Sequence, residues 1–163
     1  MTEELSRLKK RASELLSSCK SLQLATVDQY GKPLASYAPF YRTDNGDFFI
    51  FVSTLSSHTT NLAIGTASIL IIDDESKSPQ IYARNRLAFH CNCVLVNPKE
   101  NLYGKILDGL EQRHGDIIQT LRTLSDFHLY QLQPESGSFV IGFGQAYEIS
   151  PDLNNFSHIA PEK

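Results

Sequence analysis

Apolar residues recur at helical spacing in two parts of the chain. In residues 1–18 they form one stripe, with charged residues on the opposite side; the stripe is Leu5, Leu8, Ala12, Leu15 and Leu16. Near residues 98–124, Pro98 precedes a second stripe of Leu102, Ile106 and Leu110, and a further helical piece follows Gly115. Such stripes are typical of amphipathic helices that pack on a larger body.

The remaining apolar runs are short and predict β-strands. "DFFIFVS" is apolar on both faces, as a central strand would be, whereas "QIYARNRLAFHCNCVLV" alternates and predicts one long strand with a core face and a polar face. A turn at Gly137 is expected to join the last two strands. The predicted strands are residues 21–28, 33–42, 47–53, 66–74, 80–96, 127–135 and 138–150.

The order of these elements indicates the fold class. Tyr30-Gly31 and Asn45-Gly46 separate neighbouring strands at hairpin distance. Strands in hairpin succession favour an antiparallel barrel or sheet with added helices over a doubly wound parallel sheet. We therefore expect a mainly β protein of six to seven antiparallel strands with flanking helices. A single domain would span residues 1–163, with an N-terminal helix at 1–18, a barrel at 19–150 carrying a helical insert near 98–124, and a tail at 151–163.

Composition narrows the functional classes. The 163 residues are 41% hydrophobic and 20% charged, an ordinary globular mixture, and the net charge of −3 gives no general attraction to nucleic acid. No apolar stretch reaches the roughly 20 residues that a membrane-spanning helix needs. The N-terminus is charged and lacks a signal-peptide core. Three cysteines make no disulfide framework. A cytoplasmic protein without nucleic-acid or membrane partners is expected.

The first candidate site is "STLSSHTTNL", where an apolar strand gives way to hydroxyl residues and a histidine. Ser56 or Ser57 can be the N-cap of a short helix, which explains one hydroxyl. The alternative is an anion site, because free N–H groups, hydroxyls and a histidine suit a phosphate or carboxylate. The candidate residues are Ser56, Ser57, His58, Thr59 and Asn61.

The second candidate is the polar face of the strand predicted at 80–96, with Arg84, Arg86, His90 and Asn92. This face can simply be solvated. It can also bind an acidic ligand, since the guanidinium fork matches carboxylate and phosphate oxygens. The other face carries Cys91 and Cys93, which we interpret as buried small residues rather than zinc ligands.

Two further residues have open roles. Asp126 precedes a strand and can cap a turn or hydrogen-bond a histidine of the site. His158, near the C-terminus, is exposed by default, but a histidine in a flexible tail can also ligate heme iron.

Together these stretches resemble the HugZ/HutZ heme-utilisation family, a branch of the pyridoxamine 5'-phosphate oxidase-like split-barrel superfamily. The resemblance runs in order from about Ser21 to Ile149. It rests on "LQLATVDQYGKPLASYAPF", "HTTNL", "YARNRLAF" and "SDFHLYQLQPESGSFVIGFGQAYEIS". It implies a split barrel that forms a homodimer, with ligand sites in the clefts between subunits.

The resemblance also implies two possible cofactors. Flavoenzymes of the superfamily hold the FMN phosphate on the segment that here contains Ser56, His58 and Asn61, and His58 stands where they often carry a lysine. The HugZ-like branch binds heme at the dimer interface and can degrade it with oxygen. By that resemblance Arg86 contacts the heme surroundings, and Asp126 orients the histidine that ligates the iron.

In characterised heme-binding members the iron ligand is a histidine of the C-terminal tail. This sequence ends at Lys163, before the matching position, so His158 is the candidate. Three functions follow: a heme-binding, heme-degrading protein; an FMN-dependent oxidoreductase; or a heme or flavin carrier without enzymatic activity.

Overall fold

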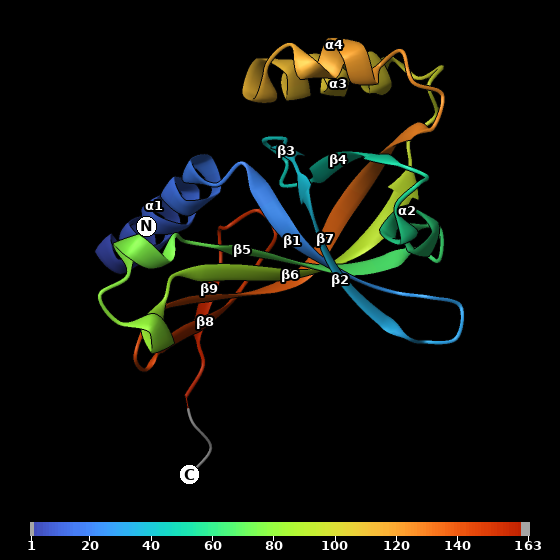
Figure 1. The fold of residues 1–163 in the computed structure, drawn as a ribbon. Helices are drawn as coiled ribbons and strands as arrows, with labels where there is room; N and C mark the ends of the chain where they lie inside the picture. The colour runs from blue at the N-terminus through green and yellow to red at the C-terminus, as the bar shows by residue number, and fades with distance from the viewer. Residues whose placement is uncertain (1, 161–163) are drawn as a thin grey trace.

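The structure is a computed structural model and describes residues 2–160 (Figure 1). One long helix precedes a curled sheet, and a helical pair is inserted before the last three strands. In chain order the elements are α1 (Glu3–Ser18), β1 (Ser21–Val27), β2 (Pro33–Pro39), β3 (Tyr41–Arg42), β4 (Phe48–Ser53), α2 (Ser57–Leu62), β5 (Thr66–Ile72), η1 (Glu75–Lys77), η2 (Ile81–Ala83), β6 (Arg86–Leu95), α3 (Asn101–His114), α4 (Ile117–Leu121), β7 (Phe127–Gly142), β8 (Gln145–Ile149) and β9 (Phe156–His158).

All strand pairs in the described part of the chain are antiparallel, as predicted. The main order is β2-β1-β5-β6-β7-β4-β3, and β8 and β9 extend from β7. The sheet curls strongly in Figure 1, so that one face encloses a core and the other faces outward. This architecture fits the expected split barrel.

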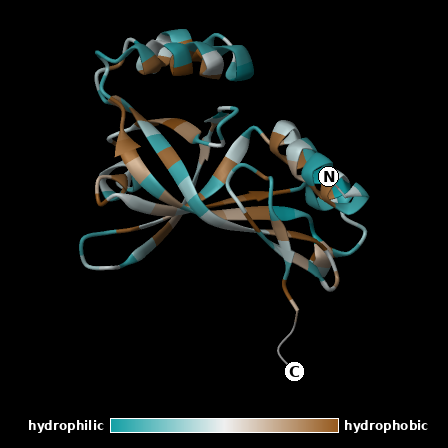
Figure 2. Ribbon diagram, turned by 180° about the vertical axis from the view of Figure 1, so that it is seen from behind, coloured by the Kyte–Doolittle hydropathy of each residue, from teal (hydrophilic) through white to brown (hydrophobic). Residues whose placement is uncertain are grey.

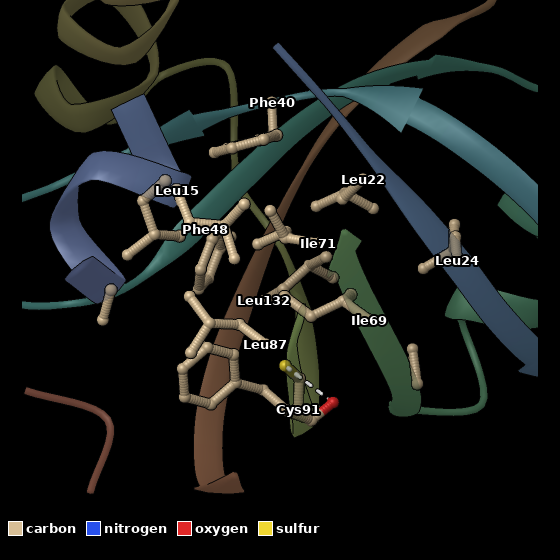
Figure 3. Packing of buried hydrophobic residues seen from close by; sticks show 14 of the residues in the cluster. Leu15, Leu22, Leu24, Phe40, Phe48, Ile69, Ile71, Leu87, Cys91 and Leu132 are labelled. Carbon is tan, nitrogen blue, oxygen red and sulfur yellow. Dashed lines mark hydrogen bonds between the residues drawn. The ribbon is translucent and has the colours of Figure 1, made fainter. Parts of the chain in front are cut away.

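The inner face of the sheet is closely packed with aliphatic and aromatic side chains (Figure 3). β4 is buried on both faces, as its sequence predicts, because it contributes to two apolar clusters. Phe48, Ile50 and Val52 join the main core. Phe49 and Phe51 join a second cluster formed with α3 and α4. The insert is thereby attached to the barrel through one shared strand.

The helices are amphipathic, as Figure 2 shows by their alternating colours. The buried positions of α1 are Leu8, Ala12, Leu15 and Leu16, four members of the predicted stripe. In α3, Ile106 and Leu110 are buried, and Leu102 packs against the second cluster. No helix within residues 2–160 combines the length and apolarity needed to cross a membrane.

The strands expected at 80–96 and 33–42 were predicted too long. The strand expected at 80–96 begins only at Arg86, because Ile81–Ala83 form the 3₁₀ turn η2. The strand expected at 33–42 is divided at Phe40, a buried residue that follows β2 and precedes β3 in the chain.

The turn predicted at Gly137 was wrong. β7 runs without interruption through this position, where Gly137 pairs with Phe89. A Cβ atom at Gly137 would lie 2.5 Å from Cδ1 of Phe89, so the glycine allows close packing instead of a turn. The chain reverses later, at Gly144, which has a φ of 65°.

Candidate functional site

The helix predicted after Ser56 is a short one, α2. Ser56 occupies the N-cap position, but its hydroxyl makes no capping hydrogen bond. Its backbone carbonyl instead accepts from the N–H of Thr59 at 3.0 Å. Ser57 is exposed and Ser56 half-buried, so these two hydroxyls are the accessible ones among the five candidate residues of this segment.

The other three candidate side chains of this segment point inward. Nδ1 of His58 lies 2.9 Å from Oγ of Ser36, and Oγ1 of Thr59 donates to the carbonyl of Ser53 at 2.5 Å. Nδ2 of Asn61 donates to Oγ1 of Thr26 at 3.1 Å, with both side chains buried. Burial also lowers the pKa of His58, which favours the neutral imidazole. Three of the five candidate side chains of this segment therefore form internal hydrogen bonds.

A hollow of about 580 Å³ opens beside α2, between β2 and β4. Ser56, Ser57 and His58 line it, and none of its lining residues is lysine or arginine. Asp126 lies behind it and accepts a hydrogen bond from Oγ of Ser53 at 2.5 Å, while its carbonyl accepts from the N–H of Thr54 at 2.8 Å. Asp126 thus holds the start of the α2 segment, and within residues 2–160 no histidine hydrogen-bonds to it.

The two candidate arginines occupy different environments. Arg84 lies outside β6; its Nη1 is 3.3 Å from Oε1 of Glu75, its Nε donates to the carbonyl of Asp73, and it lines a separate hollow of about 450 Å³. Arg86 begins β6 and is half-buried, with Nη1 donating to the carbonyl of Arg84 at 3.0 Å. The sequence prediction of one strand face carrying both arginines was therefore wrong for Arg84.

His90 and Asn92 follow Arg86 on the outward face of β6, where the predicted alternation holds. Nδ1 of His90 lies 2.8 Å from Oγ of Ser68, and Nδ2 of Asn92 donates to Glu135 at 2.7 Å. The inward-facing Cys91 and Cys93 are shielded, and burial raises their thiol pKa to about 12 and about 11. Both thiols are protonated at neutral pH.

His158 is the last residue of β9 and pairs with Tyr147 of β8. Its ring stands edge-on to Tyr147, with centroids 5.4 Å apart. Nε2 lies 2.7 Å from the carbonyl of Gly144, and because a carbonyl only accepts, Nε2 carries the hydrogen. Nδ1 therefore keeps a lone pair, and the residue is exposed. A strand, rather than a flexible tail, holds this histidine.

Within one chain the candidate residues form three separate groups: the α2 hollow with Asp126, the arginines at the start of β6, and His158 on β9. No group of three or more His, Cys, Asp and Glu side chains within residues 2–160 is arranged to hold a metal ion. Ser36, the partner of His58, was not among the predicted residues, and Ser53 was noted as a hydroxyl of the stretch but not as the partner of Asp126. Both come from strands distant from their partners in sequence, so no local pattern indicated them.

The outward face of β1, β2, β5 and β6 was also missed. It carries small side chains around an apolar hollow of about 620 Å³, and Tyr37 at its margin is 67% exposed. The residues lining the hollow include Ala25, Ala35, Ser68, Leu70 and Ala88. In each strand these residues alternate with buried ones, and this alternation could have predicted the outward face from the sequence.

Comparison with protein families gives one match, described as pyridoxamine 5'-phosphate oxidase, over residues 8–141. Among characterised proteins, the chain is 41% identical over 155 residues to a Vibrio cholerae protein described as heme oxygenase HutZ; the match covers 94% of this chain and 88% of HutZ.

Two solved structures are similar along most of the chain. HutZ from Vibrio cholerae, there described as a heme storage protein, superposes with a TM-score of 0.77 at 37% identity, covering 83% of this chain and 94% of HutZ. ChuZ from Campylobacter jejuni gives a TM-score of 0.84 at 34% identity, covering 97% of this chain and 66% of ChuZ.

Proposed function

The chain belongs to the pyridoxamine 5'-phosphate oxidase family, and from this premise we propose that it binds heme as a homodimer and degrades it in an oxygen-dependent reaction. The observation that carries the proposal is the 41% identity, across 94% of the chain, to a protein described as a heme oxygenase. The heme would lie at the dimer interface, with Arg86 of one or both subunits near its propionates.

The outward face of the sheet supports the homodimer. It combines the apolar hollow described above with small residues, which allow two sheets to approach closely. An exposed contiguous apolar patch of this kind marks an interaction surface. The candidate residues of a single chain lie in three separate groups. A two-fold dimer through this face would bring groups from two chains together in one cleft.

His158 fits the role of iron ligand. Its Nε2–H is bound to the carbonyl of Gly144, and this bond fixes the tautomer that leaves Nδ1 with a lone pair. The carbonyl acts as the outer partner that orients a ligating imidazole. This assigns to Gly144 the positioning role that the resemblance gave to Asp126, which here stabilises the α2 segment through Ser53.

The flavin alternative has less support from the geometry. A phosphate dianion needs N–H donors or cationic partners. The hollow beside α2 is lined by no arginine or lysine, His58 is biased to its neutral form, and Thr59 and Asn61 are bonded internally. Among the candidate residues of this segment, Ser56 and Ser57 are the ones with accessible hydroxyls. The phosphate of FMN would therefore find few partners on this segment.

Hemin titration tests the proposal. The wild-type protein should show a saturable Soret shift at micromolar hemin, and His158→Ala should change the position of that band. His114→Gln, which replaces a histidine at the end of α3, away from the outward face of the sheet, is the control and should leave the spectrum unaltered. The absence of any saturable change in the wild type would contradict heme binding, whereas quenching of added FMN fluorescence would support the flavin alternative.

Turnover distinguishes an enzyme from a carrier. The heme complex incubated with oxygen and a reductant should release iron and give biliverdin-like absorbance. A stable heme spectrum under these conditions would assign the protein to heme storage or transport, with the same binding residues.

The oligomeric state is a separate test. Light scattering should give twice the 18.3 kDa chain mass, and Leu70→Asp, which places a charge in the apolar hollow, should give monomers with an unchanged circular dichroism spectrum. Ile81→Asp, an exposed apolar residue outside that hollow, is the control and should remain dimeric. A monomeric wild type would rule out the proposed interface.

A further inference from the structure

A small pocket lies at the C-terminal end of α1, between this helix, β3 and α3. Its volume is about 190 Å³, enough for about six water molecules at ~30 Å³ each. It shares no lining residue with the hollow beside α2. Its lining is rich in hydroxyls and contains two arginines: Ser13, Leu16, Ser17, Phe40, Tyr41, Arg42 and Arg113.

Both guanidinium groups are held in place by other parts of the protein. Nη2 of Arg113, from α3, donates to the carbonyl of Leu16 at 3.2 Å and to that of Cys19. Nη2 of Arg42 donates to the carbonyl of Pro151 at 3.1 Å. Each arginine carbon Cζ also stands over a phenylalanine ring, at 4.9 Å for Arg113 and Phe40 and at 5.6 Å for Arg42 and Phe48. The two charges are therefore preorganised on either side of a packed aromatic pair.

Neither charge forms a close ion pair within residues 2–160, although Asp44 and Asp47 attract Arg42 from a greater distance. No carboxylate of residues 2–160 lies within 4.0 Å of either guanidinium, since the ion pairs there involve other residues. Nε of Arg42 and Nε of Arg113 are buried and have no hydrogen-bond partner among residues 2–160. Buried charges in proteins are normally paired. An anion bound in the pocket would therefore stabilise the two half-buried arginines that line it.

We propose that this pocket binds a small oxyanion of the phosphate or carboxylate class, held by Arg42 and Arg113 and by the hydroxyls of Ser13 and Tyr41. Arginine forks match these oxyanions, and serine and tyrosine hydroxyls can donate to them. The site is separate from the proposed heme site and does not depend on it. The anion would join α1, β3 and α3, and its binding would stabilise the docking of both helices on the barrel.

The first experiment compares thermal unfolding in potassium phosphate, sodium succinate and sodium chloride at matched ionic strength. Phosphate or succinate at a hundred times its Kd should raise Tm by about 5–10 °C relative to chloride. Calorimetric titration with inorganic phosphate and with succinate gives the two affinities and shows which oxyanion geometry the pocket prefers. Identical Tm values in the three salts, without measurable heat of binding, would overturn the proposal.

Substitutions test whether the anion binds in this pocket. Ser13→Glu leaves both arginines in place and puts a tethered carboxylate on the pocket wall, so it should raise Tm in chloride and weaken phosphate binding at least tenfold. Ser6→Glu adds the same charge to the same helix outside the pocket and should bind as the wild type does. Equal phosphate affinity in Ser13→Glu and wild type would place the anion elsewhere.

Arg42→Gln provides a second, independent measurement. It should weaken phosphate binding at least tenfold, whereas Arg122→Gln, which removes the same charge from the surface pair with Asp108, should not. Because Ser13→Glu requires no change in the arginines, the proposal stays testable if Arg42→Gln fails to fold. Equal losses in Arg42→Gln and Arg122→Gln would indicate only a general charge effect.

Discussion

The α2 segment and the outward face of β6 have similar compositions but opposite roles in the structure. Both combine a histidine with other polar side chains, and both are candidate anion sites by sequence. In the α2 segment, His58, Thr59 and Asn61 turn inward and bond to neighbouring strands. On β6, Arg86, His90 and Asn92 lie on the outward face of the sheet, half-buried or exposed.

The difference shows that the number of polar residues in a segment does not give the number of free donors. A helix with one buried face turns its polar residues toward the core when strands nearby offer partners. A strand whose inner face is filled by Leu87, Phe89 and Cys91 must present its alternate residues outward. The first region is therefore expected to determine stability, and the second to determine ligand binding.

Replacing Arg86 by glutamate should have the largest effect, on binding rather than on folding. A charge pair turned repulsive in a partly desolvated site costs about 2–5 kcal/mol. Hemin affinity, measured by Soret titration, should fall accordingly. Arg122→Glu on the insert is the matched charge control and should bind hemin normally. Unchanged affinity in Arg86→Glu would mean that the β6 face is merely solvated and that the contrast between the two regions fails.

Asn61→Ala tests the α2 side of the comparison. It leaves Oγ1 of the buried Thr26 without its donor, which should lower the free energy of unfolding by about 1–3 kcal/mol. Asn92→Ala removes the same side chain from the exposed face of β6, where the cost should stay within about 0.5 kcal/mol. Urea unfolding of both variants measures the difference. Equal losses would show that the two regions do not differ in their contribution to stability.

The pH dependence of stability should show the smallest effect. Burial lowers the pKa of His58, so below its unfolded value of about 6.5 the unfolded chain binds more protons than the folded one. The contribution of His58 is therefore fully present above that pH and is lost as pH falls toward the folded pKa. Burial lowers the pKa of His114 as well, against the opposing hydrogen bond to Phe40.

His58→Gln should flatten part of the loss of stability that occurs as pH falls below about 6.5. His114→Gln should likewise flatten part of the profile, because burial lowers the pKa of that histidine too. Denaturant unfolding at several pH values measures this. A profile of His58→Gln that is identical to the wild type would indicate that the imidazole is not held neutral by burial.

Local patterns predicted the elements well where one physical requirement determined them. The stripe containing Leu8, Ala12 and Leu15 could only be buried by a helix, and β4 needed cover on both faces. Gly137 was misread because turns and close packing both select glycine, and only the ring of Phe89 distinguishes them. Arg84 was placed on the strand because alternation continues into η2 without a sequence break.

The candidate site was less predictable because hydrogen-bond partners are distant in sequence. Ser36 is 22 residues from His58, and Ser53 is 73 residues from Asp126. The sequence identifies the residue types of the site but not whether their donors face the core or the ligand. The pocket between Arg42 and Arg113 was missed for the same reason, since its walls come from α1, β3 and α3.

The double burial of β4 has a consequence for how the fold can vary. Phe48, Ile50 and Val52 anchor one core, and Phe49 and Phe51 anchor the other, so each cluster depends on the same six-residue strand. A shortened homologue without residues 98–124 would expose Phe49 and Phe51 on β4, next to the edge strand β3. Loss of the helical pair therefore demands compensating polar substitutions on that strand, or a new partner to cover it.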